Sequence, residues 1–128
     1  MKYICNVSCA ILLMISSSAV IAADIADDMN VIVENVGVLQ SSTRTDEILS
    51  ALDKMQSAAE NAKKGIPNKL YGKADNAMAL ADYQQGLDKL IVVIDKSRQQ
   101  VKSGDIQALK EDVKEMMEIR NIYHKKYR

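Results

Sequence analysis

Residues 104–128 read GDIQALKEDVKEMMEIRNIYHKKYR. Gly104 is typical of a position just beyond the end of a helix, and Asp105 is well placed to cap the start of the next one. Side chains then recur three or four positions apart, as they do on one face of a helix. That face consists of Ile106, Leu109, Val113, Met117, Arg120, His124 and Tyr127. It includes the only histidine of the chain, His124.

Two amphipathic segments with the same spacing lie near the start of the chain. The first begins after a predicted cap at Asp24, and its apolar face contains Ile25, Met29, Ile32, Val36 and Leu39. A polar hinge at 41–44 follows, in which Thr43 together with Asp46 resembles a capping box that opens the second helix. The second apolar face contains Ile48, Leu52, Met55, Ala59 and Ala62. We expect this helix to stop at Gly65, because Pro67 prevents its continuation.

A third helix is predicted to begin near Asn76, after a longer connection at 66–75, and to end at Gly104. Its apolar face contains Tyr83, Leu87, Leu90, Ile94 and Val101. No alternating pattern indicates a sheet. Four amphipathic helices joined mostly by short loops predict an all-α fold, an antiparallel up-down-up-down four-helix bundle.

The first 22 residues have the pattern of a cleaved signal peptide. Lys2 provides the positive start, residues 10–15 are an apolar run, and 20–22 end in alanine before an acidic, polar sequence. The apolar stretch is shorter than the roughly 20 residues that a membrane span requires. We therefore expect export to the periplasm, cleavage after Ala22, and one domain over residues 23–128 with no membrane contact.

Cleavage would remove both cysteines, Cys5 and Cys9, so a disulfide or thiolate site is excluded from the remaining domain. It would also remove Lys2, leaving 16 basic and 17 acidic residues. A near-neutral chain without a long basic run does not have the profile of a nucleic-acid-binding protein.

In an up-down-up-down bundle, the first helix starts and the fourth helix finishes at the same end. Met29 and His124 could therefore face each other across a short gap. One thioether sulfur and one imidazole nitrogen are a ligand set found at cytochrome haem irons. The ordinary interpretations stay open as well, because methionines commonly fill helical cores and a histidine near a terminus is commonly solvated or capping.

Two further features agree with a cofactor without requiring one. Gly86 falls in the middle of the third helix, where glycine costs about 1 kcal/mol relative to alanine. It permits close approach of either a ligand or a neighbouring helix. Residues 23–128 contain no Trp and no Phe, so a planar apolar cofactor would supply missing core volume. Arg120, one turn before His124, is by itself a solvated charge with its stem packed on the core.

The sequence from Ala23 to Arg128 resembles the small periplasmic cytochrome b562 family. The most specific stretches are ADIADDM at 23–29 and RNIYHKKYR at 120–128. Between them, YQQGL at 83–87 is similar to the aromatic-x-x-Gly-aromatic segment of that family, and Lys69-Leu70 follows Pro67 as the family pattern expects. The resemblance implies that Met29 and His124 are the axial ligands of one non-covalent haem b.

The same resemblance implies roles for four residues around that haem. Arg120 would lie beside the haem edge, and Tyr83, Gly86 and Leu87 would belong to the haem-binding segment. The family commonly has an aromatic side chain at Leu87, so we expect this aliphatic residue to alter haem affinity and potential rather than ligation. Tyr83 keeps the aromatic ring but adds a hydroxyl that needs a hydrogen-bond partner.

No Cys-x-x-Cys-His motif occurs, so a bound haem would be an exchangeable b-type group. Two protein ligands would leave no open position for oxygen or peroxide, which favours electron transfer and disfavours an enzyme. The methionine sulfur would favour a comparatively high potential. We expect a monomeric electron carrier, whose redox partner proteins are not identified by the sequence.

Two alternatives remain from the residues alone. One is a cofactor-free periplasmic helical bundle that acts as a binding or stress-response module, in which Met29 and His124 are packing and surface residues. The other is a transition-metal site formed by His124 and nearby carboxylates. It is the weaker alternative, because one histidine without a cysteine is a poor supply of ligands.

Overall fold

The computed structural model describes residues 25–127. In this range the chain forms α1 (Ile25–Ser41), α2 (Thr45–Ala62), the short 3-10 helix η1 (Asn68–Leu70), α3 (Ala77–Lys102) and α4 (Ala108–Tyr127). No strand occurs between residues 25 and 127. The predicted signal peptide at 1–22 and the predicted cap at Asp24 lie outside the described residues.

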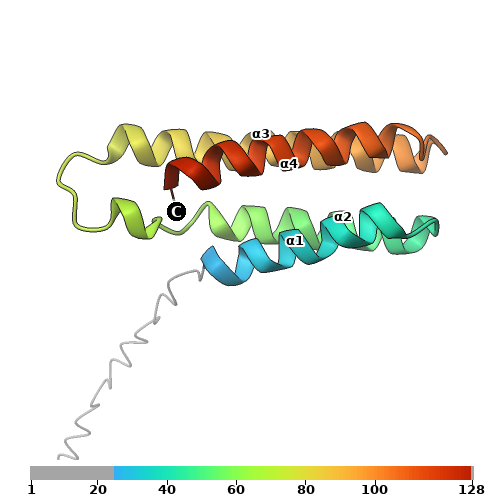
Figure 1. Cartoon of the computed structure of the whole chain (residues 1–128), viewed down its shortest axis with the longest axis horizontal. Helices are drawn as coiled ribbons and strands as arrows, with labels where there is room; N and C mark the ends of the chain where they lie inside the picture. The colour runs from blue at the N-terminus through green and yellow to red at the C-terminus, as the bar shows by residue number, and fades with distance from the viewer. Residues whose placement is uncertain (1–24, 128) are drawn as a thin grey trace, which may run out of the picture.

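The four helices run antiparallel to their neighbours in sequence, which confirms the predicted four-helix bundle (Figure 1). Helix α1 packs on α2, α2 on α3, and α3 on α4, whereas α1 and α4 make the least contact among the neighbouring helix pairs. The start of α1, the end of α4 and the connection between α2 and α3 all lie at one end of the bundle (Figure 1). We call this the open end.

The core forms where the apolar faces of the helices meet. Every residue of the apolar faces predicted for the second and third helices is buried. In α1 the predicted face is buried from Ile32 onward, whereas Ile25 and Met29 are half-buried. Burial of a large aliphatic side chain contributes about 1.5–3 kcal/mol to folding. Packing of these apolar faces therefore holds the helices together. The core therefore becomes less complete toward the open end.

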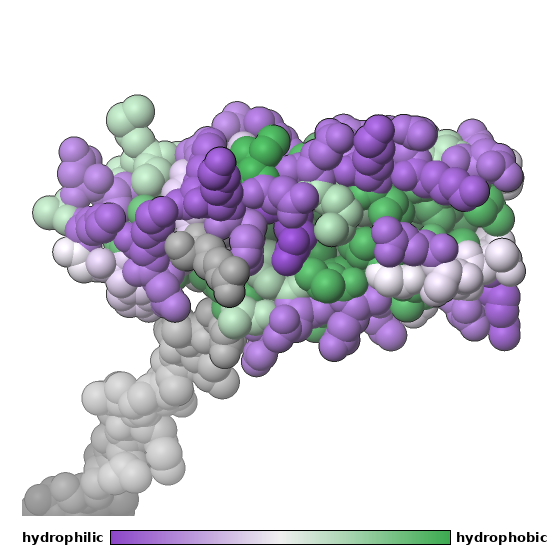
Figure 2. All heavy atoms as spheres, viewed as in Figure 1, coloured by the Kyte–Doolittle hydropathy of each residue, from purple (hydrophilic) through white to green (hydrophobic). Residues whose placement is uncertain are grey.

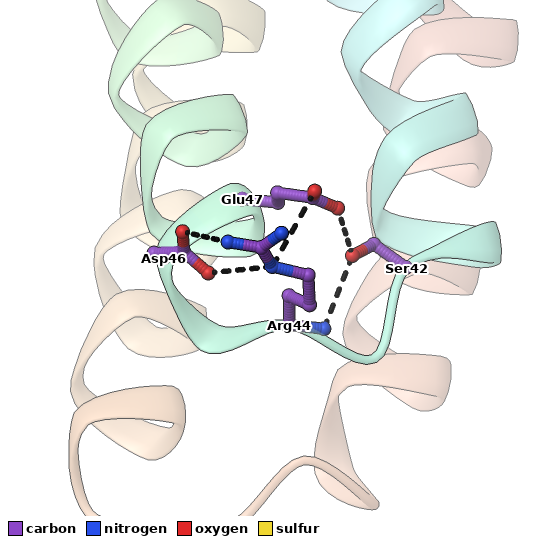
Figure 3. Close-up of polar contacts among 4 residues, drawn as sticks. All are labelled: Ser42, Arg44, Asp46 and Glu47. Carbon is purple, nitrogen blue, oxygen red and sulfur yellow. Dashed lines mark hydrogen bonds and ion pairs between the residues drawn. The ribbon is translucent and has the colours of Figure 1, made fainter.

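The turn between α1 and α2 differs from the predicted capping box (Figure 3). Helix α2 begins at Thr45, so Arg44 occupies the position before it and provides no side-chain cap. The Asp46 carboxylate accepts hydrogen bonds of 3.2 and 2.8 Å from the Arg44 guanidinium instead of capping an amide. The hydroxyl of Ser42 accepts from the Arg44 amide at 3.1 Å and donates to Glu47 at 2.6 Å. The predicted capping pair of Thr43 and Asp46 was therefore wrong, because Arg44 engages the carboxylate.

Helix α2 also ends earlier than the predicted stop at Gly65. The amide of Lys64 donates to the Asn61 carbonyl at 3.0 Å, and the amide of Gly65 donates to the Ala62 carbonyl at 3.1 Å. These hydrogen bonds span three residues rather than four, so the regular α-helix finishes at Ala62. The connection to α3 is then held by the Asn76 side chain, which donates to the Leu70 carbonyl at 3.0 Å.

The boundary between α3 and α4 matches its prediction. Gly104 has a positive φ of 87°, a conformation that glycine adopts without strain. The carboxylate of Asp105 accepts a 3.2 Å hydrogen bond from the amide of Ala108, as a helix cap does. The buried face of α4 is rotated slightly from the predicted one, because Met116 is 1% exposed whereas Met117 is half-buried.

Candidate functional site

Met29 lies in the second turn of α1, on a different flank of the helix from the Asp28 contact with α2, and it packs against the core. The preceding residue, Asp28, marks the α2 side, because its carboxylate accepts a 2.8 Å hydrogen bond from the side-chain amide of Asn61. Consecutive residues are about 100° apart around a helix, so Met29 points roughly at a right angle to that contact. Val33, one turn further along, is 43% exposed on the same flank. This flank of α1 is therefore apolar but incompletely covered.

His124 lies in the last turn of α4 and is exposed. It is eleven residues after the buried Val113, which places the two about 20° apart around the helix. The imidazole thus lies on a core-facing side of α4 although it is not covered. Within residues 25–127, neither the His124 nor the Met29 side chain makes a hydrogen bond or an ion pair. Both donor groups are therefore available to a ligand.

The opposite flank of α4 is attached to α3 near the open end. Lys126 forms a 3.1 Å ion pair with Asp82, and the hydroxyl of Tyr127 donates a 2.5 Å hydrogen bond to the same carboxylate. Nearer the other end of the helix, Glu115 pairs with Lys96 at 2.9 Å. All three α4 residues lie on the side toward α3, so His124 lies on the flank that remains, toward α1.

Apolar surface is visible between the α1–α2 pair and the α3–α4 pair on the face shown in Figure 2. On the two helices that border this seam, Val33 of α1 is 43% exposed, and Met29 of α1 and Met117 of α4 are half-buried and packed against the core. Water-exposed apolar area of this kind is unfavourable unless it is small or covered by a ligand. The seam between α1 and α4 is thus the part of the bundle best suited to receive an apolar group.

Arg120 is half-buried one turn before His124. Its Nη1 donates a 3.1 Å hydrogen bond to the side chain of Asn121, and it forms no ion pair among residues 25–127. Its charge is therefore not neutralised by a protein carboxylate. The structure places this cation on the same flank of α4 as His124.

Tyr83 is buried on α3, and its hydroxyl donates a 3.0 Å hydrogen bond to the carbonyl of Ala62. The partner that this hydroxyl required is thus a backbone group at the end of α2. Burial, with a smaller effect of the nearby Asp28 charge, raises the pKa of Tyr83 to about 12. The rings of Tyr83 and Tyr127 meet edge to face, with centroids 5.8 Å apart.

Gly86 and Leu87 are both buried at the next turn of α3. Leu87 belongs to the hydrophobic core, together with residues of all four helices. Gly86 lies beneath the ring of Tyr123 from α4. The residue that approaches this mid-helix glycine is therefore an aromatic side chain of the neighbouring helix.

Tyr123 and Asp82 were not identified from the sequence. Tyr123 is seven residues after Met116, or about two helical turns, and this spacing was the available signal. It was missed because the face of α4 was centred on Met117 instead of Met116. For Asp82 there was no comparable signal, because its partners are more than forty residues away in sequence.

No group of three or more His, Cys, Asp or Glu residues within the described range could hold a metal ion. The alternative metal site at His124 therefore has no carboxylate cluster beside it in residues 25–127. In the same part of the chain, no helix is long and apolar enough to cross a membrane.

Comparisons with known proteins agree with the fold. A protein-family model described as cytochrome b562 matches residues 24–128. Probable soluble cytochrome b562 1 of Yersinia pestis is 45% identical over 115 residues, which cover 90% of this chain and 91% of the relative. Probable soluble cytochrome b562 2 of the same organism is 38% identical over 116 residues, which cover 91% of each chain. An uncharacterised protein of Pasteurella multocida is 24% identical over 117 residues, again covering 91% of each.

An antiparallel up-down-up-down four-helix bundle is an architecture that builds cofactor sites between facing helices. The family model covers the whole of the described bundle, and two of the relatives are 45% and 38% identical to this chain. The chain belongs to the cytochrome b562 family, whose members are electron-transfer proteins and not enzymes.

Proposed function

We propose that this protein is a periplasmic electron carrier that binds one non-covalent haem b between α1 and α4. Met29 and His124 would be its axial ligands. The observation that supports this most strongly is their placement on the flanks of α1 and α4 that α2 and α3 leave free. Both side chains lie at the same end of the bundle, and neither has a polar partner within residues 25–127.

The donor set fits a haem iron. Met29 supplies one neutral thioether sulfur and His124 supplies one imidazole nitrogen, a combination that raises the potential of a cytochrome. When bound, the haem would supply a one-electron couple between ferrous and ferric iron. We expect His124 to coordinate through Nε2, while Nδ1 donates to a carbonyl or water that orients the ring. Because both ligands come from the protein, no position would be left for a substrate.

The surrounding residues would hold the cofactor by shape and charge. Leu87 and Tyr83 provide buried apolar surface on α3, and the Tyr83 hydroxyl is already bonded to the Ala62 carbonyl. Arg120 would place a positive charge beside the haem edge, where no protein carboxylate in residues 25–127 pairs with it. Binding would therefore cover the seam between α1 and α4 without breaking an existing ion pair.

The location and assembly of the protein are part of the same proposal. The pattern at residues 1–22 supports export and cleavage of a signal peptide, so electron transfer would take place in the periplasm. We propose that the protein acts as a monomer with one haem per chain and exchanges electrons with partner proteins through an outer-sphere contact.

Spectra of ligand variants test the proposal. His124→Ala should lose the stable low-spin spectrum, because the chain has no other histidine. Met29→Ala should leave a five-coordinate or water-ligated iron with a lower potential. Met117→Ala serves as a control, because this methionine is half-buried on α4 beside the same seam. An unchanged low-spin spectrum and potential in Met29→Ala would remove Met29 from the ligand set. A fully folded wild-type protein that stays colourless with haem would instead support the cofactor-free bundle.

A further inference from the structure

Gly86 and Tyr123 form the closest approach between α3 and α4 near the proposed haem ligands. A Cβ atom at position 86 would lie 2.5 Å from Cγ and 2.6 Å from Cε1 of Tyr123, far inside ordinary van der Waals contact. Position 86 therefore has to be glycine if the Tyr123 ring is to stay where it is. The opposing side chain is a rigid ring rather than the flexible end of a long side chain, so the overlap cannot be relieved by a small rotation.

Other contacts hold the Tyr123 ring in the same place. The Lys89 ammonium lies 3.3 Å from the Tyr123 hydroxyl, and the Lys126 ammonium lies 4.9 Å from the ring centroid. The ring of Tyr127 stacks on it with centroids 6.5 Å apart and planes 19° from parallel. Such cation–π and aromatic contacts favour one position of the ring. The last turn of α4 is thus oriented by Tyr123.

Tyr123 immediately precedes His124 in the sequence. Because consecutive side chains are about 100° apart around a helix, fixing Tyr123 on α3 also fixes the direction in which His124 leaves α4. In the bundle, α4 has α3 on one side and α1 on the other. The Tyr123 side chain occupies the first side, and His124 is left facing the second, where Met29 lies.

We propose that Gly86 and Tyr123 are positioning residues for His124, and that their contact sets the rotation of the end of α4 so that the imidazole faces Met29. This inference rests on the proposed haem ligation. It adds that ligand geometry is controlled from α3, by a glycine that makes room for an aromatic ring, although neither residue is a ligand.

The contact itself can be tested without haem by thermal unfolding of the purified protein. Replacing a helical glycine with alanine normally stabilises a helix. Gly37→Ala is the matched control, because Gly37 is an exposed glycine of α1 with nothing within 4 Å of an added Cβ. We expect Gly37→Ala to raise the unfolding temperature and Gly86→Ala to lower it. In a Tyr123→Ala background, Gly86→Ala should raise it again. A rise in both single variants would overturn the proposed contact.

The positioning role is tested with haem by three variants in the last turns of α4. Tyr123→Ala should weaken haem binding by about tenfold to a hundredfold, as expected when a group that orients a metal ligand is lost. It should also lower the low-spin fraction at saturation. Tyr123→Phe keeps the ring and should preserve both properties. Ile122→Ala is the control for helix fraying, because Ile122 is exposed in the same turn and should have no effect.

These experiments separate the positioning role of Gly86 and Tyr123 from the proposed haem ligation. A wild-type protein that binds haem with a low-spin spectrum, together with an unchanged Tyr123→Ala variant, would overturn the positioning role alone. A wild-type protein that does not bind haem would contradict the proposed function and, with it, the positioning role. Loss of affinity in Ile122→Ala equal to that in Tyr123→Ala would also overturn the inference, because general fraying would then explain both.

Discussion

The Tyr127 hydroxyl donates a 2.5 Å hydrogen bond to Oδ2 of Asp82, which also pairs with Lys126 at 3.1 Å. This carboxylate on the second turn of α3 therefore receives two groups from the last turn of α4. The contact joins residues 45 positions apart, and it lies at the open end of the bundle. These two polar contacts attach the end of α4 to α3.

The two buried or partly buried tyrosines at this end predict a loss of stability at alkaline pH. Burial raises the pKa of Tyr83 to about 12, and burial with the Asp82 hydrogen bond raises the pKa of Tyr127 to about 12. A raised pKa means that the folded state retains the proton that the unfolded chain releases near pH 10.0. The contribution of these two tyrosines to stability should therefore be constant below about pH 10 and fall as the pH rises toward 12.

Denaturant unfolding between neutral and strongly alkaline pH measures this loss. The double variant Tyr83→Phe/Tyr127→Phe should show a weaker decrease than the wild type, because phenylalanine does not titrate. Tyr71→Phe is the control, since Tyr71 is 62% exposed. Equal alkaline losses in the wild type and the double variant would contradict the prediction.

At acid pH the same contact predicts the opposite dependence. The hydrogen bond from Tyr127 and the ion pair with Lys126 lower the pKa of Asp82 from its usual value of 3.8. A carboxylate whose pKa is lower in the folded protein than in the unfolded chain stabilises the fold at pH values above its unfolded-state pKa. This contribution is lost as the pH falls through its folded-state pKa. Asp82→Asn should therefore be less stable than the wild type at neutral pH, and the difference should shrink as the pH falls below the usual carboxyl pKa of 3.8 and through the lowered pKa of folded Asp82.

Acid unfolding curves followed by circular dichroism provide the measurement. Asp75→Asn is a suitable control, because Asp75 is an exposed carboxylate in the connection before α3. It should leave the neutral stability and the acid midpoint unchanged. A constant difference between Asp82→Asn and the wild type across the acid range would mean that Asp82 does not stabilise the fold through its charge.

The fold was largely predictable because the apolar stripes of α2 and α3 follow helical spacing without interruption. The positions of Leu52 and Ile94 in the core, for example, follow directly from that spacing. Helix ends were less predictable, since they depend on which polar group reaches a free amide. At the start of α2, the Asp46 carboxylate binds the Arg44 guanidinium instead of a backbone amide. A local capping pattern does not indicate which of these two donors the carboxylate will bind.

The candidate site was predictable in part. The placement of Met29 and His124 at one end followed from the up-down-up-down order. Their role as haem ligands is what the family resemblance implies, and it stays a proposal. The contacts that orient the end of α4 did not follow, because Gly86, Tyr123 and Asp82 interact across helices rather than along one. Sequence periodicity identifies the face that a residue occupies, but it does not identify the neighbouring helix that the face contacts.

A buried carboxylate between α3 and α4 gives a prediction away from the proposed haem site. Asp112 is 2% exposed. Its carboxylate accepts a 3.0 Å hydrogen bond from the Ser97 hydroxyl and forms a 2.8 Å ion pair with Lys96. Asp112→Ala removes an acceptor that both groups use, and we expect a loss of about 1–3 kcal/mol in the free energy of unfolding. Glu115→Ala removes the exposed partner of the same lysine and should cost at most about 1 kcal/mol.

Urea unfolding of the two variants measures this difference, with the haem spectrum as a second readout. Neither variant should change the low-spin spectrum, because Asp112 and Glu115 lie more than two helical turns from His124. Equal costs for the two substitutions would show that burial of Asp112 does not strengthen its hydrogen bonds.

Haem binding should also stabilise the bundle. A ligand that binds only the folded state adds about 4 kcal/mol to the free energy of unfolding when its free concentration is a thousand times Kd. We expect excess haem to shift the urea midpoint of the wild type upward and to shift that of His124→Ala much less. A shift of equal size in both proteins would indicate binding that does not use His124.

The measurement that tests the proposed haem site most directly is a titration of haem into the purified protein, with absorption spectra of the oxidised and dithionite-reduced forms. Coordination by Met29 and His124 predicts saturation at one haem per chain, with sharp α and β bands in the reduced form. A broad spectrum like that of free haem, without saturation, would contradict it.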